Sequence, residues 1–251
     1  MSASNRRGHG IHSPFVYDFV VKVLSDPFSE RKNYDDIERI RKDFKSSGKK
    51  IPILDLGAGS YKNKSPERKV SSIVQSAAKP ARFGRFFYRM VRYYGIESVL
   101  ELGTSLGMST RYFAKGMPHG IVHSIEGAPE LAEFTQTQLA KEGFGNITVT
   151  QGEFSEVLPD VLTKMRGRKI IYIDGNHRYA PTISYFHEVL KSIGNDDILV
   201  FDDIHWSQEM EKAWKEIKNN EQVSCIIDLF FIGIVFFRKE FKEKCSFSFR
   251  F

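Results

Sequence analysis

The chain has 251 residues, of which 41% are hydrophobic and 27% are charged. This composition is ordinary for a soluble globular protein and excludes a wholly disordered chain, and the length is enough to bury a sizeable core. The longest uncharged apolar run, Leu229–Phe237, is far shorter than the roughly 20 residues that a membrane-spanning helix needs. With only Cys225 and Cys245, and no apolar block typical of a signal peptide at the N-terminus, the cytoplasm is the expected location.

The net charge of +6 is unevenly distributed along the chain. Residues 1–97 hold 20 Lys and Arg against 10 Asp and Glu, whereas residues 98–251 hold 17 against 21. Such asymmetry indicates different roles for the two parts. We therefore expect two units, residues 1–97 and residues 98–251, of which the first carries the basic excess.

The first unit is expected to be mainly helical. Pro14–Leu24 places its apolar side chains on one helical face, and Tyr34–Phe44 is a charged amphipathic stretch. Lys69–Tyr94 is expected to form two helices because Pro80 and Gly84 interrupt it. This helical subdomain is a candidate lid over an active site or a candidate contact in a homodimer.

A basic segment with interleaved aromatic side chains runs from Lys62 to Arg92. Such a pattern is one way to bind single-stranded nucleic acid. Arg82, Arg85, Arg89 and Arg92 also share one helical face, so a solvated helix face is the interpretation that we favour over nucleic acid. A lid that attracts an anionic substrate is the third alternative.

From residue 98 onward, short apolar runs alternate with amphipathic stretches, which is typical of β/α units on a parallel sheet. Five units precede an antiparallel hairpin that is expected to close one sheet edge. The expected strands are Ser98–Leu102, Ile121–Ile125, Ile147–Thr150, Ile170–Ile173 and Ile198–Phe201, then Val223–Asp228 and Ile232–Arg238 in the hairpin. The expected helices are Met108–Lys115, Pro129–Lys141, Phe154–Met165, Thr182–Ser192 and Ser207–Lys218.

The first of these strands runs into a small turn that contains two glycines, Glu101-Leu102-Gly103-Thr104-Ser105-Leu106-Gly107. Glycines there allow a ligand to approach the backbone closely, and the following helix offers free N–H groups. The second strand ends at Glu126, and an acid at that position can accept both hydroxyl hydrogens of a ribose. A packing turn and a helix-capping glutamate are the structural alternatives. The ordered pair of features favours a binding site.

In the order of these motifs the chain resembles class I S-adenosylmethionine (SAM)-dependent methyltransferases over about Glu97–Arg238. The resemblance implies an α/β fold with a Rossmann-like, seven-stranded, mostly parallel sheet and a C-terminal antiparallel hairpin. It also implies SAM as the cofactor, with the ribose on Glu126 and the adenine near Gln151-Gly152-Glu153-Phe154. The implied cofactor contacts are Glu101, Gly103, Thr104, Ser105, Gly107, Ser109, Glu126, Gly127, Glu153, Phe154 and Asp174.

Three carboxylates, Asp174, Asp202 and Asp203, follow the fourth and fifth expected strands, where open α/β sheets place ligands. Three hard oxygen ligands suit Mg²⁺. The pattern is similar to metal-dependent O-methyltransferases of the catechol, caffeoyl-CoA and macrolide-sugar types, and this resemblance implies that the three side chains are metal ligands. Helix capping and turn formation are the structural alternatives.

The expected reaction is methyl transfer to a hydroxyl of a small molecule. A divalent metal would lower the pKa of the bound hydroxyl, and a neighbouring base would accept its proton. His177 follows Asp174 by three residues, where catechol-type enzymes carry lysine, and the pair is the expected catalytic group; alternatively, His177 only orients Asp174 or its loop. His205 and Trp206 are candidate substrate contacts. A nucleic-acid methyltransferase and a non-catalytic SAM-binding protein are the alternative functions.

A second glycine motif, Asp55-Leu56-Gly57-Ala58-Gly59, also looks like a first methyltransferase motif. It is followed by a polar stretch, with no second strand and no acid about 20 residues further on. We expect a loop of the N-terminal unit that either folds over the active site or has a purely structural role.

Overall fold

The structure is a computed structural model that describes residues 13–25, 32–52 and 67–251 of the chain. The second glycine motif at Asp55–Gly59, together with Lys62 and Lys64 of the basic segment, lies outside the described residues. Within the three described ranges, no helix combines the length and the apolar character that crossing a membrane requires.

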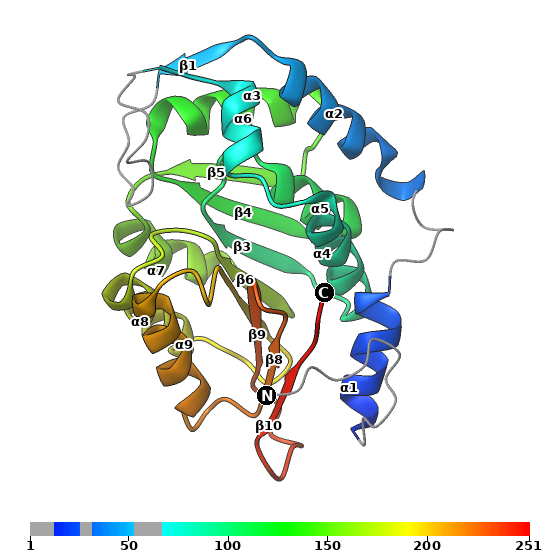
Figure 1. The fold of residues 1–251 in the computed structure, drawn as a ribbon, viewed down its shortest axis with the longest axis vertical. Coiled ribbons are helices and arrows are strands. Elements are labelled where there is room, and N and C mark those ends of the chain that lie inside the picture. The colour runs from blue at the N-terminus through cyan, green and yellow to red at the C-terminus, as the bar shows by residue number, and fades with distance from the viewer. Residues whose placement is uncertain (1–12, 26–31, 53–66) are drawn as a thin grey trace.

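An eight-stranded sheet forms the centre of the molecule, in the spatial order β10-β8-β9-β7-β6-β3-β4-β5 (Figure 1). Its five parallel strands each agree with the prediction to within one residue, because each apolar run stops at a residue that favours a turn. They are β3 (Ser98–Leu102), β4 (Ile121–Glu126), β5 (Ile147–Gln151), β6 (Lys169–Ile173) and β7 (Ile198–Asp202).

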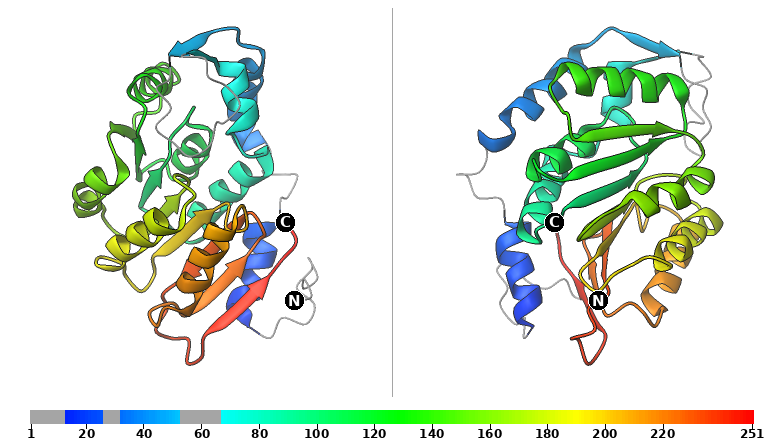
Figure 2. Two further views of the ribbon diagram at one scale, coloured as in Figure 1. Left: turned by 60° about the vertical axis from the view of Figure 1, so that its left-hand side comes forward. Right: turned by 180° about the vertical axis from the view of Figure 1, so that it is seen from behind.

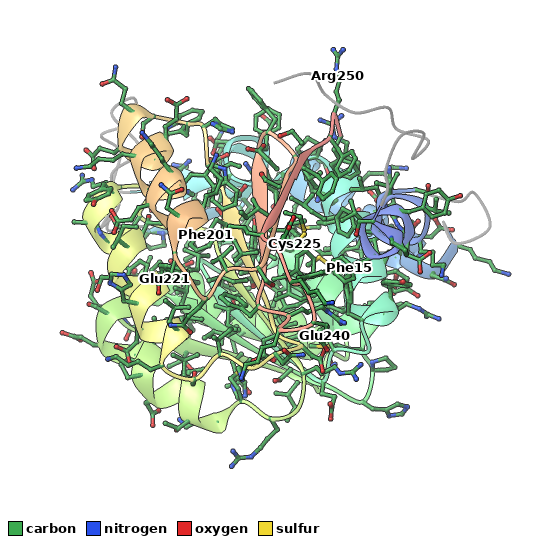
Figure 3. All side chains as sticks on the ribbon, turned by 90° about the horizontal axis from the view of Figure 1, so that it is seen from below. Phe15, Phe201, Glu221, Cys225, Glu240 and Arg250 are labelled. Atoms are coloured by element: carbon green, nitrogen blue, oxygen red, sulfur yellow. The ribbon has the colours of Figure 1, made fainter. Side chains whose placement is uncertain are left out.

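The predicted hairpin forms, but it does not close the sheet. Strands β8 (Cys225–Asp228) and β9 (Ile232–Phe236) pair antiparallel, and β9 lies antiparallel to β7. A further strand, β10 (Cys245–Ser248), pairs parallel with β8 and forms the edge, which raises the strand count from the predicted seven to eight. Figure 3 views this edge, with Cys225 in β8 and Arg250 just beyond β10.

Helices cover both faces of the sheet (Figure 2). Alternate strand residues face opposite layers, so that Val99 and Ile170 belong to one core cluster and Leu100 and Ile171 to the other. The first face packs against α1 (Pro14–Asp18), the π-helix η1 (Phe19–Leu24), α4 (Ala81–Tyr93), α5 (Met108–Gly116) and α6 (Pro129–Lys141). The second packs against α7 (Phe154–Lys164), α8 (Tyr179–Leu190) and α9 (Gln208–Asn219).

The remaining N-terminal elements lie over the turn that follows β3. Helices α2 (Asp35–Ser46) and α3 (Val70–Ser76) share a hydrophobic cluster with Leu106 of that turn. Two short strands that were not predicted, β1 (Lys50–Pro52) and β2 (Glu67–Lys69), pair antiparallel beside them. The segment Lys69–Tyr94 does form two helices, and the connection between α3 and α4 is thereby held next to the strand ends.

Candidate active site

The turn after β3 lies against the end of β6. A Cβ atom on Gly103 would lie 2.0 Å from the backbone oxygen of Asp174, and the φ angle of Gly103 is +103°, so the turn needs glycine here. The N–H of Asp174 donates to the carbonyl of Leu102 at 2.9 Å. The predicted glycine turn and the predicted catalytic acid are therefore neighbours.

Glu126 ends β4 and reaches across to the same turn. Its Oε2 accepts a hydrogen bond from the N–H of Ser105 at 2.7 Å, and its Oε1 accepts one from the N–H of Ala128 at 3.0 Å. Burial raises the pKa of this carboxyl. A Cβ atom on the adjacent Gly127 would meet nothing within 4 Å, so this residue borders open space.

Glu101 lies beneath the turn and is fully buried. Its carboxylate accepts hydrogen bonds from the hydroxyls of Ser109, of Thr110 at 2.5 Å and of Ser124 at 2.7 Å, and Ser124 is itself 2.6 Å from the hydroxyl of Thr104. Burial raises the pKa of Glu101 to about 7 despite these bonds. This arrangement makes Glu101 and Thr104 supports of the turn.

Arg111 is a second support, and sequence reasoning missed it. Its fully buried guanidinium donates to the carbonyls of Leu106 at 2.7 Å and Gly107 at 2.8 Å, and binds both carboxylate oxygens of Glu142. A cation in the middle of the apolar helix Met108–Lys115 was the available signal, because a buried arginine needs acceptors.

The predicted adenine region lies at the next strand end. Phe154 begins α7, and a Cβ atom on Gly175 would lie 2.4 Å from its ring, so the ring covers the residue after Asp174. The ring also contacts Tyr185, at 6.0 Å between centroids. Glu153 directly precedes α7 and is exposed.

A cavity opens between these strand ends and the α3–α4 connection. It brings residues of the glycine turn together with residues of the N-terminal helices and of β6. Its walls include Lys79, Phe87, Gly103, Ser105, Tyr172 and Asp174.

Asp174, Asp202 and Asp203 are hereafter the acid group; Asp174 lines this cavity, and Asp202 and Asp203 lie behind its wall residues Tyr172 and Lys79. The Tyr172 hydroxyl lies 3.1 Å from Oδ2 of Asp174 and 3.0 Å from Oδ2 of Asp202, so its single proton serves two carboxyls. Burial raises the pKa of Asp174 to about 6 and that of Asp202 well above its usual value. The Lys79 ammonium lies 3.0 Å from Oδ1 of Asp202 and hydrogen-bonds Oδ1 of Asp203.

This geometry does not fit the Mg²⁺ site that the sequence predicted. In the part of the chain that the structure describes, no group of three His, Cys, Asp or Glu side chains is placed to hold a metal ion. Asp202 and Asp203 turn an oxygen toward the Lys79 ammonium, and Asp174 faces Tyr172. The three predicted ligands thus form an ion-paired and hydrogen-bonded group. Lys79, which lies outside the motif, occupies the place that the sequence assigned to Mg²⁺.

Backbone strain concentrates in the same loops. Four non-glycine residues of the described chain have a positive φ, and Ser105, Asn176 and Asp203 are three of them, in the loops after β3, β6 and β7. The fourth, Phe230, lies in the β8–β9 turn. Such conformations cost about 1–3 kcal/mol each and gather at functional sites.

The predicted histidines have different surroundings. Nε2 of His177 lies 3.6 Å from Oδ1 of Asp174, so His177 stands beside the acid group. His205 is held by Asp228, whose Oδ2 lies 3.0 Å from Nε2, and Trp206 is 74% exposed. None of His177, His205 and Trp206 belongs to the cavity wall, but His177 lies beside its wall residue Asp174.

The predicted basic face of α4 is engaged by its neighbours. Arg85 pairs with Glu38 at 3.2 Å, Arg89 is buried and donates to the carbonyl of Val23 at 2.8 Å, and Arg92 donates to the Tyr88 hydroxyl at 2.8 Å. Arg82 and Arg92 are exposed, as the favoured interpretation of a solvated helix face expects, whereas the burial of Arg89 on the same face contradicts it.

Residues 100–204 match the sequence profile of a family described as a methyltransferase domain. Over these residues the chain is similar to methyltransferase domains. The match covers β3 to β7 and so includes the glycine turn, Glu126 and the acid group. It confirms the resemblance on which the prediction of the fold rested.

Individual relatives carry related names. The chain is 38% identical over 63 residues to a protein-L-isoaspartate O-methyltransferase of Methanocella arvoryzae; the aligned stretch covers 25% of this chain and 34% of that protein. It is 25% identical over 124 residues to a catechol O-methyltransferase of Niastella koreensis, and this stretch covers 48% of this chain and 55% of that protein. The chain thus spans about a third to a half of the curated relatives that it matches.

The fold of this chain also occurs in solved structures. The O-methyltransferase TomG from Streptomyces achromogenes, involved in tomaymycin synthesis and solved in complex with SAM, superposes with a TM-score of 0.55 at 20% identity. The superposition covers 64% of this chain and 82% of TomG. At this identity the likeness concerns the fold.

Proposed function

We propose that this chain transfers the methyl group of SAM to a hydroxyl oxygen of a small molecule. The observation that carries the proposal is that the Gly103–Ser105 turn and Asp174 line one cavity, and that Glu126 holds this turn through the N–H of Ser105, within a stretch that matches methyltransferases. The O-methyltransferases among the relatives support oxygen as the acceptor atom.

The residues present fit SAM. Glu126 retains lone-pair capacity beyond the backbone N–H groups that it accepts from, and a ribose hydroxyl could donate to it from the open space that Gly127 borders. Phe154 offers an aromatic edge to the adenine. Asp174 brings negative charge to the cavity, which suits a cofactor whose reacting end is positively charged.

When bound, SAM supplies a methyl group on a cationic sulfur, which is electrophilic without further activation. The protein's task is therefore to position the acceptor hydroxyl and to take its proton. We assign the proton to His177, and Asp174, at 3.6 Å, stabilises the imidazolium that results. No metal-assisted step belongs to this proposal, because Asp202 and Asp203 are paired with Lys79.

Calorimetry with S-adenosylhomocysteine (SAH), the reaction product, tests the cofactor assignment. Glu126→Ala is expected to weaken binding by about 10- to 100-fold, because a hydrogen bond to a charged group contributes about 1.5–3 kcal/mol. Glu130→Ala, on the exposed start of α6, is the matched control and is expected to bind like the wild type. Wild-type protein that gives no binding at about 1 mM SAH would exclude the assignment.

Transfer of labelled methyl from SAM tests the reaction. The acceptors are a panel of hydroxylated small molecules and, separately, RNA. Label in a small molecule supports the proposal, label in RNA supports the nucleic-acid alternative, and SAM binding without transfer to either supports a non-catalytic role. His177→Ala with an unchanged rate would remove His177 as the base.

A further inference from the structure

The acid group holds a lysine where the sequence predicted a divalent cation. Lys79 belongs to the connection between α3 and α4, 124 residues before Asp203. Its ammonium lies 3.0 Å from Oδ1 of Asp202 and donates a hydrogen bond to Oδ1 of Asp203. The Lys79 side chain is only 21% exposed, so this is an enclosed ion pair and not a surface contact.

The position of Lys79 is well supported by its surroundings. The ring of Phe231 lies 5.4 Å from Nζ, within range of a cation–π contact. Helix α4 begins directly after Pro80 and buries Phe83 and Phe87 in the core, which anchors the connection on that side. The ammonium is therefore held both by its charge partners and by the helix that follows it.

Lys79 and a metal ion need the same oxygens. Oδ1 of Asp202 already accepts from the N–H of Asp203 at 2.9 Å and faces Lys79, while Oδ2 lies 3.0 Å from the Tyr172 hydroxyl. A Mg²⁺ ion would have to bind about 2.0–2.1 Å from a carboxylate oxygen. That places it within a few ångströms of an ammonium, where like charges repel strongly.

We propose that Lys79 is the resident cation of the active site and that its ammonium excludes divalent metal ions from Asp202 and Asp203. The consequence for catalysis rests on the proposed methyl transfer. There Lys79 is a positioning residue: it offsets the charge of the carboxylates beside the cavity and fastens the α3–α4 connection to the end of β7. The acceptor hydroxyl then enters a site in which the cation is the Lys79 ammonium and not a bound metal ion.

Calorimetric measurement of Mn²⁺ binding tests the inference. The wild type is expected to show no binding below about 1 mM, and Lys79→Met is expected to bind at least about tenfold more tightly, since both carboxylates lose their partner. Lys79→Arg keeps the charge and is the matched control, with no gain expected. Adding Asp203→Asn to Lys79→Met is expected to abolish the gain. Lys79→Met is a folded sample if it retains the circular dichroism of the wild type.

Two outcomes overturn the inference. One is a wild type that binds Mn²⁺ at about 100 μM or below and loses this binding in Asp203→Asn. The other is a folded Lys79→Met that gains no metal affinity. If Lys79→Met does not fold, the comparison of the wild type with Asp203→Asn decides the question. SAH binding by the same samples is read separately: its absence in the wild type refutes the proposed function and leaves the metal result valid.

Discussion

Glu101→Gln isolates the electrostatic cost of the buried carboxyl beneath the glycine turn. Burial raises the pKa of Glu101 from 4.5 to about 7 in the folded protein. Because the folded-state pKa is the higher one, the stability that this group contributes is fully present below about pH 4.5 and is lost as the pH rises through about 7. The complete loss corresponds to about 3 kcal/mol.

Urea denaturation of the wild type and of Glu101→Gln, at a series of pH values, measures this loss. Between about pH 5 and pH 8 the wild type should lose about 2–3 kcal/mol through Glu101, whereas a neutral glutamine loses nothing. The free energy of unfolding of the variant minus that of the wild type should therefore rise by about 2–3 kcal/mol over this range. Taking the difference cancels the contributions of all other groups that titrate in the same way in both proteins.

Glu133→Gln, on the exposed face of α6, is the control. It should leave the difference close to constant from about pH 5 to pH 8. If Glu101→Gln also gives a constant difference, the carboxyl of Glu101 keeps an ordinary pKa in the folded state. The hydrogen bonds from Ser109, Thr110 and Ser124 would then outweigh burial, contrary to our reasoning.

Two further predictions concern packing and the support of the turn. Gly84→Ala places a Cβ atom 2.2 Å from the Tyr112 ring, so it should lower the free energy of unfolding by about 1–3 kcal/mol in urea titrations, whereas Gly48→Ala meets nothing within 4 Å and should be near neutral. Arg111→Met leaves Glu142 and two carbonyls without their donor and should cost about 3 kcal/mol or more; a double variant with Glu142→Met that recovers none of this loss would contradict the ion-pair explanation.

The parallel core of the fold was predictable because the sequence shows both of its patterns, short apolar runs for the strands and apolar residues at helical spacing between them. Four of the five helices after β3 agree with the prediction to within one residue at each end. The exception is α8, which begins at Tyr179 and not at Thr182, because Pro181 falls within its first turn, where proline is tolerated. Strand β10 was missed since four residues, Cys245–Ser248, carry too little pattern to separate a strand from a loop.

The N-terminal helices were predicted with less accuracy because their form depends on tertiary packing. Pro14–Leu24 has a continuous apolar face, yet the structure changes from α-helix to π-helix at Phe19. Both halves bury residues against the sheet, in the cluster that also contains Phe86 of α4. Periodicity predicts which side is buried, but the fit against the neighbouring helix determines the local winding.

The strand-end part of the site was predictable for a topological reason. Parallel neighbouring strands end at one edge of the sheet, so Gly103, Glu126 and Asp174, each placed after a predicted strand, had to come together once β3, β4 and β6 were adjacent. Arg111, which supports the turn from α5, followed no such rule. The same holds for Asp228, which accepts from His205 and Trp214 and belongs to a strand whose neighbours the motifs do not specify.

Lys79 shows most clearly where a motif-based assignment of a site fails. A metal triad is recognised from the ligands alone, and Asp174, Asp202 and Asp203 have the residue types and the strand-end positions that such a triad requires. Whether those oxygens are available depends on any cation that the rest of the chain brings to them, and Lys79 arrives from a segment that local patterning assigns only to a basic helical region. Because a carboxylate pair binds an ammonium and a divalent ion with the same lone pairs, identical acidic motifs can support a metal centre in one protein and an internal ion pair in another. For this site, the residue that decides between the two is outside the motif.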